Sequence, residues 1–333
     1  MSKKIDITEM AGAVRAGDRR ALARAITLVE STRSDHRAQA EALLAALPRV
    51  AGSNVRIGIT GAPGVGKSTF IEAFGSHLTA QGLRLAVLAV DPSSSRTGGS
   101  ILGDKTRMEA LSRDPNAFIR PTPAGRSLGG VARRTREAMA LVEAAGYDVT
   151  IVETVGVGQS EYAVADMVDM FLLLVAPGGG DELQGIKRGI MELADLLVVN
   201  KADGAMVPAA NNAAADYRNA LNLIRPKDSH WRAEVILASA LEGKGLVEIW
   251  ATVQRFQAEQ RAGGRDGQDR AVQAQRWLWE EIQDDLLDEL KSDKALAPLI
   301  TARERAVGAG EITPSAAARE ILRAFLGKEK SEE

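Results

Sequence analysis

The sequence predicts an α/β protein built on a doubly wound, mainly parallel sheet, with helical extensions at both ends. Two observations support this fold class. Short, almost continuously apolar runs alternate with helix-like segments through the middle of the chain, and a parallel strand that is covered on both faces needs such runs. Helical patterns alone precede and follow this region, so we expect the sheet domain to be flanked by helices.

The predicted elements follow in chain order. Residues 1–50 carry helical patterns and predict an N-terminal helical extension. Residues 51–260 predict the sheet domain. Its strands are expected at six apolar runs: Val55 to Thr60, Leu85 to Val90, Val149 to Val152, Met170 to Val175, Leu196 to Val199 and Val235 to Leu237. From Gly245 onward the pattern is helical, and its apolar positions lie on one helix face.

Residues 261–333 predict a C-terminal helical arm. Its last helix is expected to begin with Thr313 as a cap and Pro314 in the first position. Trp277, Trp279 and Leu287 widen the apolar surface of the arm beyond one stripe, which favours self-association. Packing of the arm back onto its own α/β domain explains the same pattern equally well.

Composition excludes several classes of protein. The 333 residues hold 42 Lys and Arg against 44 Asp and Glu, so the net charge of -2 does not indicate a nucleic-acid or membrane-surface partner. The absence of cysteine excludes disulfides and thiolate metal sites. The longest apolar run, Met170 to Ala176, is far shorter than the ~20 residues of a membrane helix. Because the start of the chain also shows no signal-peptide pattern, we expect a cytoplasmic protein.

The strongest motif fits G-x-x-x-x-G-K-[ST] and lies between a predicted strand and a predicted helix. Glycines let such a loop curl so that backbone N–H groups point inward, and the helix start adds partial positive charge where phosphates sit. The lysine would contact the β- and γ-phosphates and the serine hydroxyl would bind Mg²⁺. The predicted phosphate-binding residues are Gly61, Ala62, Pro63, Gly64, Val65, Gly66, Lys67, Ser68 and the following Thr69.

A second motif predicts which base is bound. Asn200, Lys201 and Asp203 follow the apolar run that ends at Val199 and fit N-K-x-D. An ionised Asp203 accepts from the two adjacent N–H donors of guanine, whereas adenine offers an acceptor at one of these positions. We expect Asn200 to tie this loop to the phosphate loop and Lys201 to cover the base plane. A further loop at Ser239 and Ala240 is expected to place the Ala240 N–H against guanine O6.

Three carboxylates are candidates for the metal and for catalysis. Asp91 and Glu153 each follow a predicted strand, and ligands of open α/β sheets bind outside those ends. Asp104 lies in a loop rich in Gly and Ser. Mg²⁺ usually takes only one or two carboxylates, so some of the three would act through water beside Ser68. We assign catalytic roles to Lys67, Asp91, Asp104 and Glu153; a helix cap or a solvated acid is the alternative, above all for Asp104.

A glycine-rich loop after the predicted strand Met170 to Val175 indicates a segment that changes conformation, because consecutive glycines lose much backbone entropy when they are ordered. The residues concerned are Gly178, Gly179, Gly180, Asp181, Glu182, Gln184 and Lys187. A tight strand-to-helix connection with Asp181 as the cap explains the same residues without any switch.

The order of these motifs, with Asp91-Pro92-Ser93-Ser94 and the run Glu-Thr-Val-Gly-Val-Gly-Gln-Ser from Glu153 to Ser160, closely resembles the MeaB/ArgK family of SIMIBI-class P-loop GTPases. The resemblance covers nearly the whole chain. It implies a GTPase that uses Mg²⁺ with GTP and GDP as ligands, and it makes the loop from Gly178 to Arg188 a third switch. It also implies a homodimer formed through the C-terminal arm.

The resemblance further implies a chaperone of adenosylcobalamin-dependent methylmalonyl-CoA mutase that gates cofactor loading, protection and reactivation. No water-positioning Gln stands beside Gly156, although Gln159 follows, so we expect slow intrinsic hydrolysis. Two alternatives stay open. One is a GTP-dependent kinase that acts on a transport protein. The other, a metal-delivery GTPase, is disfavoured because the chain has no cysteine and only three scattered histidines.

Overall fold

The computed structural model describes residues 6–31, 33–47, 54–90, 108–122, 128–154, 160–178, 188–224 and 230–328. The chain forms two compact units, residues 1–273 and residues 274–333, which are described separately below. Among the described residues, no helix has both the length and the apolar character that are needed to cross a bilayer.

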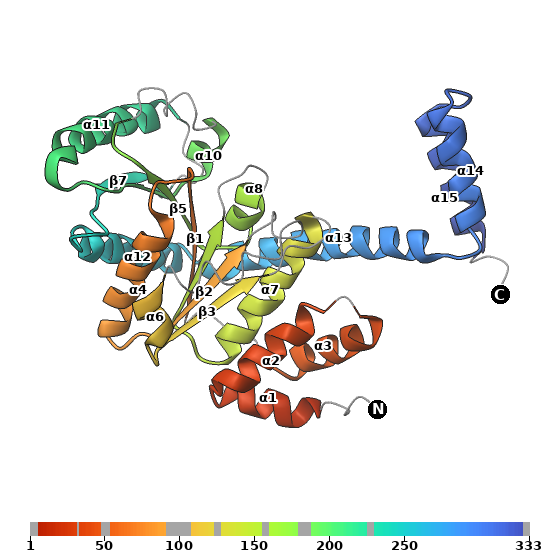
Figure 1. Cartoon of the computed structure of the whole chain (residues 1–333), viewed down its shortest axis with the longest axis horizontal. Helices are drawn as coiled ribbons and strands as arrows, with labels where there is room; N and C mark the ends of the chain where they lie inside the picture. The colour runs from red at the N-terminus through yellow and green to blue at the C-terminus, as the bar shows by residue number, and fades with distance from the viewer. Residues whose placement is uncertain are drawn as a thin grey trace. The chain divides into compact units, whose positions relative to one another are not determined.

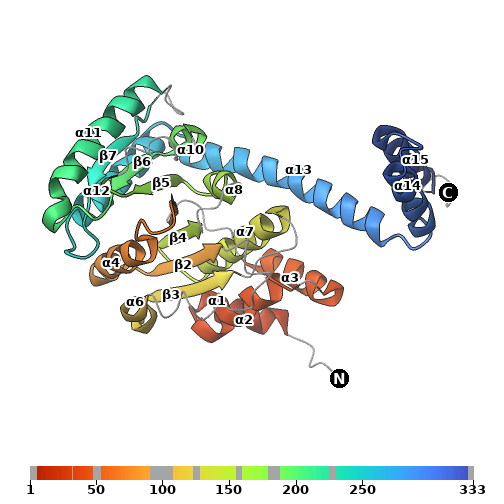
Figure 2. The ribbon, with the colours of Figure 1, turned by 45° about the horizontal axis from the view of Figure 1, so that its top comes forward.

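The first unit contains a seven-stranded sheet in which every neighbouring pair is parallel (Figure 2). The strand order is β3-β2-β4-β1-β5-β6-β7, so β1 lies at the centre between β4 and β5. The predicted parallel α/β architecture is therefore confirmed. The strands are β1 (Val55–Gly61), β2 (Leu85–Val90), β3 (Ala117–Thr122), β4 (Val149–Thr154), β5 (Met170–Val175), β6 (Leu196–Val199) and β7 (Glu234–Leu237).

Strand β3 is not predicted by apolar runs, and β4 extends two residues beyond its predicted end at Val152. Arg120 and Pro121 interrupt the apolar run of β3, and proline is tolerated there because β3 is an edge strand that pairs only with β2. Strand β4 continues through Glu153 and Thr154, since Glu153 still pairs with Ile59 of β1. Apolar patterning locates a buried strand well, but it does not detect polar residues that extend the strand to the edge of the sheet.

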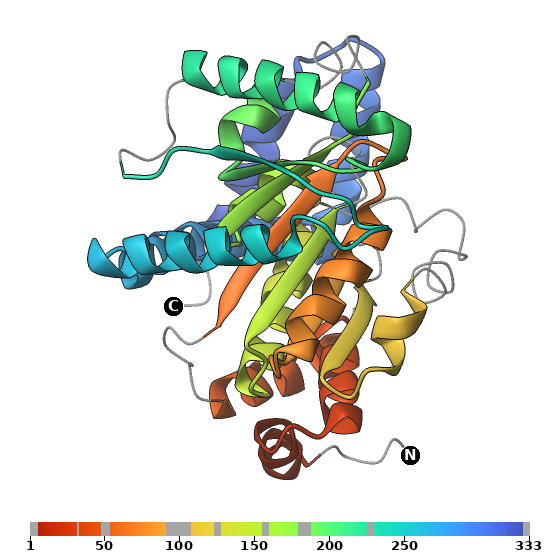
Figure 3. The same cartoon turned by 90° about the vertical axis from the view of Figure 1, so that its left-hand side faces the viewer.

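Helices cover both faces of the sheet. One face carries α4 (Lys67–Ala80), α6 (Glu109–Arg113) and α12 (Leu246–Ala262), as Figure 3 shows. On the other, α7 (Leu128–Ala144) contacts β2, β3 and β4, and the N-terminal helices pack against its outer side (Figure 1). Those helices are α1 (Ile7–Arg15), α2 (Arg19–Val29) and α3 (Ser34–Ala46). Further helices that the structure describes in this unit are α8 (Ser160–Ala165), α10 (Arg188–Leu193), η2 (Gly204–Met206), α11 (Val207–Leu223) and the start of α13 (Asp266–Ser292).

A hydrophobic cluster of buried residues lies between the sheet and the helices α4 and α12. Phe70 stacks on Phe74 with ring centroids 5.6 Å apart, and Phe74 meets Trp250 of α12 edge to face at 6.4 Å. Such pairs add about 0.5–1.5 kcal/mol beyond the buried area. This cluster holds α4 rigidly against β1, and α4 is the helix that follows the predicted phosphate loop.

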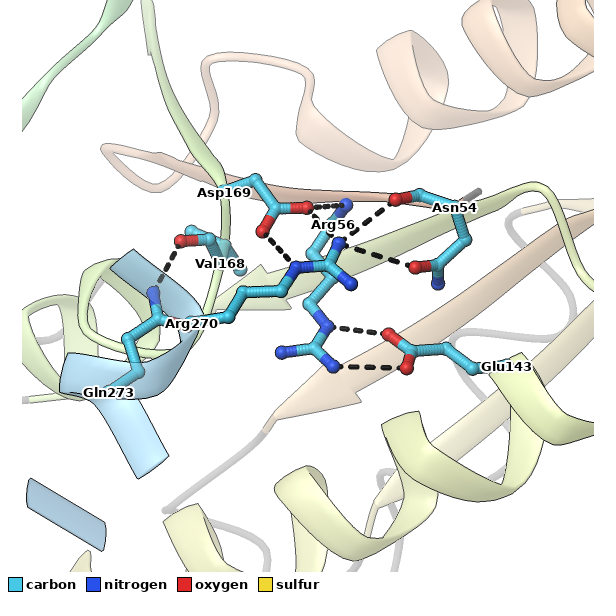
Figure 4. A network of polar contacts seen from close by, with 7 residues as sticks. All are labelled: Asn54, Arg56, Glu143, Val168, Asp169, Arg270 and Gln273. Carbon is cyan, nitrogen blue, oxygen red and sulfur yellow. Dashed lines mark hydrogen bonds and ion pairs between the residues drawn. The ribbon is translucent and has the colours of Figure 1, made fainter. Parts of the chain in front are cut away.

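A network of polar side chains lies at the amino-terminal edge of the sheet, where the strands begin (Figure 4). Arg56 of β1 makes a bidentate ion pair with Glu143 of α7, with nitrogen–oxygen distances of 2.5 and 3.0 Å. Arg270 donates to both carboxylate oxygens of Asp169, at 2.9 and 2.7 Å, and to the Asn54 carbonyl oxygen at 2.9 Å. This network ties the start of α13 (Asp266–Ser292) to the start of β1 and β5.

The second unit contains the later part of α13 and the helices α14 (Ala297–Gly308) and α15 (Pro314–Lys328). Helices α14 and α15 pack on each other. Thr313 caps α15, since its side-chain oxygen accepts from the Ala316 N–H at 3.3 Å. The predicted cap with proline in the first position is confirmed. An ion pair between Arg303 and Glu320, at 2.6 Å, joins α14 to α15.

Candidate nucleotide-binding site

The candidate site lies at the carboxyl edge of the sheet, where β1, β4, β5 and β6 end. Strand β1 leads into the loop of residues 61–66, and α4 begins at Lys67. In open α/β sheets this edge is where ligands bind. The structure therefore brings the two predicted loops, which follow β1 and β6, to the same edge.

Glycine is required at three positions of the phosphate loop. A methyl group at Gly61 would lie 2.4 Å from the carbonyl oxygen of Leu174 in β5, so no other residue fits there. Gly64 and Gly66 have φ values of 85° and 93°, in the left-handed region that favours glycine. A methyl group on Gly64 would meet nothing within 4 Å, so its outer side is open. The first N–H groups of α4 have no partner within the helix and are available to an anion.

Lys67 holds its ammonium group within this loop. The Nζ atom donates to the carbonyl oxygens of Gly61, at 2.6 Å, and Ala62, at 3.2 Å. Burial lowers the pKa of the Lys67 ammonium, and the negative charges of Glu153 and Glu161 act in the opposite direction. The Lys67 ammonium group is thus held by two loop carbonyl oxygens at the place where phosphates would bind.

The oxygen donors that the structure describes suit a magnesium ion. Ser68 is the second residue of α4 and carries a hydroxyl at the helix start, where the loop ends. Glu153 supplies a carboxylate that is only 7% exposed, one residue before the end of β4. A hydroxyl and a carboxylate are the hard ligands that Mg²⁺ prefers. The other two predicted carboxylates, Asp91 and Asp104, lie outside the described residues.

The base-recognition loop is tied to the phosphate loop by two side chains. The Asn200 Nδ2 atom donates to the Val65 carbonyl oxygen at 3.0 Å, which is the contact that the sequence analysis expected. Lys201, with a left-handed φ of 59°, donates from Nζ to the Gly64 carbonyl oxygen at 2.7 Å. These contacts join segments more than 130 residues apart, so the separation between the predicted phosphate and base positions is set by the fold.

Asp203 is oriented by Ser239. The buried Ser239 hydroxyl donates to Asp203 Oδ2 at 2.5 Å and accepts from the Glu242 N–H at 3.0 Å. The Ala240 N–H donates to Asn200 Oδ1 at 3.2 Å in this structure, and its contact with guanine O6 stays a prediction. That amide therefore supports the Asn200 side chain in this structure.

A buried group of polar residues that the sequence does not predict lies beside the site. Thr60, Thr154 and Glu161 are connected by hydrogen bonds at the ends of β1 and β4 and the start of α8. The signal in the sequence was weak, because threonines at the end of an apolar run look like ordinary strand residues. Two arginines of this unit are held by ion pairs: Arg120 pairs with Glu30 and Arg133 with Glu137.

Only the first residue of the predicted switch loop is described. Gly178 follows β5 with a φ of 112°, and a methyl group there would lie 3.7 Å from the Met206 side chain. The remaining residues of this prediction, Gly179, Gly180, Asp181, Glu182, Gln184 and Lys187, lie outside the described residues. Met206 belongs to η2, which begins directly after Asp203, so the start of the loop adjoins the base-recognition segment.

Comparison with known proteins decides the family. The profile of the family described as methylmalonyl Co-A mutase-associated GTPase MeaB matches residues 22–295. The chain belongs to the MeaB family. A protein of Caulobacter vibrioides is 57% identical over 325 residues, which cover 98% of this chain and 99% of the relative. The Mus musculus methylmalonic aciduria type A homolog, mitochondrial, is 51% identical over 322 residues, covering 94% of this chain and 78% of the relative.

A solved structure agrees with this assignment. The crystal structure of a LAO/AO transport system kinase matches with a TM-score of 0.76 at 39% sequence identity, covering 97% of this chain and 100% of that chain. The predicted membership in the MeaB/ArgK family and the predicted fold are confirmed. As a member of the MeaB family of GTPases, the protein hydrolyses GTP.

Proposed function

We propose that this GTPase acts as a chaperone of adenosylcobalamin-dependent methylmalonyl-CoA mutase, and that GTP binding and hydrolysis gate cofactor loading, protection and reactivation. The observation that carries the proposal is the match of residues 22–295 to a family described as mutase-associated. The structure supports it with a phosphate loop that is tied through Asn200 and Lys201 to a base-recognition loop. This proposal places the protein in the cytoplasm, with the mutase as its partner.

In this proposal each side chain of the site has one task. Lys67 and the first N–H groups of α4 bind the β- and γ-phosphates, and Asp203 selects guanine. Ser68 and Glu153, with Asp91 and Asp104 as the further predicted ligands, would hold Mg²⁺. The ion would neutralise charge that develops on the phosphates during hydrolysis. Partial burial of Lys67 strengthens its attraction to a phosphate, because the local dielectric is lower than in water.

Contacts between helices α8 and α10 would couple the nucleotide state to the conformation of the predicted third switch. Helix α8 follows residues 155–159, α10 follows the switch residues, and the two helices are in contact. Tyr162 of α8 lies so close to Gly189 of α10 that a methyl group on Gly189 would be 2.1 Å from the tyrosine oxygen. A shift of α8 therefore cannot leave α10 unaffected. We propose that residues 178–187 contact the mutase and that their conformation depends on the bound nucleotide.

A chaperone of this kind must bind the mutase with different affinity in its two nucleotide states, since equal affinities would regulate nothing. Calorimetric titration of the mutase with the full chain, loaded either with a non-hydrolysable GTP analogue or with GDP, tests this requirement. We expect dissociation constants that differ at least about tenfold, or about 1.4 kcal/mol. Equal dissociation constants, or no binding in either nucleotide state, would refute the proposal.

A second candidate function is supported by the 39% identical structure, which is described as a transport system kinase. Positioning of the γ-phosphate is common to kinases and GTPases, so the phosphate loop does not separate them. Incubation of the protein with γ-labelled GTP, alone and with a candidate transport protein, separates the two functions. Label that appears only as free phosphate supports the chaperone, and label on the transport protein supports the kinase.

We also propose that the second unit mediates formation of a homodimer. Helix α13 exposes large apolar side chains there, among them Trp279, which is 65% exposed, and Leu278, Leu286 and Leu287. Burial of such a surface against a second copy is a common source of dimer stability. Light scattering should show a dimer that Trp279→Glu converts to a monomer. The control Leu223→Glu changes an exposed leucine of the first unit and should leave the dimer intact.

A further inference from the structure

Three buried polar side chains form a chain of hydrogen bonds beneath the phosphate loop. Thr154 Oγ1 donates to Thr60 Oγ1 at 2.8 Å, and Thr60 Oγ1 donates to Glu161 Oε1 at 3.2 Å. Thr60 and Thr154 are 0% exposed and Glu161 is 4% exposed. Buried polar groups that are satisfied in this way have few alternative arrangements, because breaking one bond leaves an unpaired polar atom.

The positions of these residues in the chain connect them to the site. Thr60 directly precedes Gly61, the first residue of the phosphate loop. Thr154 directly follows Glu153 and ends β4. Glu161 is the second residue of α8, the helix that comes after residues 155–159. A single hydroxyl, that of Thr60, therefore joins the end of β4 and the start of α8 to the phosphate-loop strand.

The packing around Gly58 explains why α8 reaches Thr60. Gly58 and Thr60 lie two residues apart in β1 and share a face of the sheet. A methyl group on Gly58 would lie 2.8 Å from Phe171 and 3.0 Å from Val164 of α8, so the glycine is what allows α8 to approach. Val164 and Glu161 are three residues apart and share a face of the helix. Close contact at Gly58 thus brings Glu161 onto Thr60.

The direction of the hydrogen bonds gives Thr60 a specific task. Its one hydroxyl hydrogen goes to the Glu161 carboxylate, and its oxygen accepts from Thr154. Glu161 and Glu153 are also the two acids whose charges act on Lys67. The position of both carboxylates relative to the lysine therefore depends on contacts made at the ends of β1, β4 and α8.

We infer that Thr60 is a positioning residue for GTP hydrolysis, which holds the Glu153 end of β4 and the start of α8 in register with the phosphate loop. Because Thr60 is fully buried, we assign it no direct contact with the nucleotide. Loss of the Thr60 hydroxyl should lower the rate of the chemical step. GTP affinity should be retained, since the phosphate loop and the base-recognition loop do not depend on that hydroxyl. The inference rests on GTP hydrolysis alone and not on the proposed role with the mutase.

The test compares two substitutions in the full chain. Thr60→Val keeps the shape and removes the hydroxyl, whereas Thr60→Ser keeps the hydroxyl. Single-turnover hydrolysis of GTP with Mg²⁺ and the Kd for GTP are measured for both. We expect Thr60→Val to hydrolyse GTP about 10- to 100-fold more slowly, in line with the effect of small misplacements in active sites, with its Kd within about twofold. Thr60→Ser should recover most of the rate.

Thr150→Val is the matched control. Thr150, like Thr60 and Thr154, is a fully buried threonine. It lies in β4 on the same face as Thr154, but at the opposite end of the strand. A wild-type rate in Thr60→Val, a rise in its Kd that matches its loss of rate, or an equal loss in Thr150→Val would each overturn the inference. If Thr60→Val does not fold, Thr154→Val decides: slower hydrolysis at unchanged Kd supports the inference, and a wild-type rate overturns it.

Discussion

Asp203→Asn tests the base assignment, and the structure fixes which way the new amide must face. The Ser239 oxygen already accepts from the Glu242 N–H, so the Ser239 hydrogen is directed at Asp203 Oδ2, 2.5 Å away. An amide nitrogen cannot accept that hydrogen. The amide oxygen of the variant therefore stays with Ser239, and the NH₂ group takes the place of Oδ1.

The magnitude follows from the number of hydrogen bonds that are lost. Guanine offers two adjacent N–H donors, and the NH₂ group would confront one of them. Hydrogen bonds to a charged partner are each worth about 1.5–3 kcal/mol. Loss of one of these bonds, or of both, would cost about 1.5–6 kcal/mol and weaken the Kd for GTP by about 10- to 10⁴-fold. Xanthine presents an acceptor in place of one donor, so the variant should bind XTP more tightly than the wild type does.

Calorimetry of the full chain with the magnesium complexes of GTP and XTP measures this exchange of preference. Asp216→Asn, which neutralises an exposed carboxylate on α11, is the control for the change in net charge and should leave both Kd values unchanged. Adding Ser239→Ala to Asp203→Asn frees the amide to turn, so the preference for XTP should decrease. An unchanged ratio of the Kd values for GTP and XTP in Asp203→Asn would refute the assignment of the base.

Three further substitutions probe other contacts. Lys67→Ala should abolish tight GTP binding while thermal unfolding stays cooperative, and wild-type affinity in calorimetry would contradict the role of its ammonium. Glu143→Gln should destabilise the protein by about 3–5 kcal/mol in urea unfolding, because the buried Arg56 loses its charged partner; replacing both with Met and Leu should be nearly neutral. Gly189→Ala should change the free energy of unfolding by less than about 1 kcal/mol by the same measurement, because the Tyr162 hydroxyl that its methyl group would overlap is the end of a half-exposed side chain that can rotate away. A loss of several kcal/mol would show that the Tyr162 side chain is held in place.

Most of the strands and the two nucleotide-binding loops could be predicted from short stretches of sequence. Apolar runs found six of the seven strands, because a strand buried on both faces needs them. The edge strand β3 was missed since an edge position permits Arg120 and Pro121. The glycines of the phosphate loop were recognisable because local backbone geometry, with φ near 90° at Gly64 and Gly66, restricts the residue type.

The supporting contacts of the candidate site could not be predicted in this way. Ser239 holds Asp203 across 36 residues, and Thr60 meets Thr154 and Glu161 across 94 and 101 residues. The same is true at the opposite edge, where Arg270 meets Asp169. In each case the residues are common types whose partner is not indicated by their neighbours in the chain.

The sequence by itself determined the fold class and the family and predicted the loops for phosphate and base, because each depends on local patterns of apolar residues, glycines and charges. Only the tertiary structure decided which side chains orient those loops. The strand order places β4 between β1 and β2, and it thereby brings Thr154 beside Thr60. That order is settled by the packing of the whole sheet and its helices, so contacts between distant segments follow from the fold rather than from any single stretch of the chain.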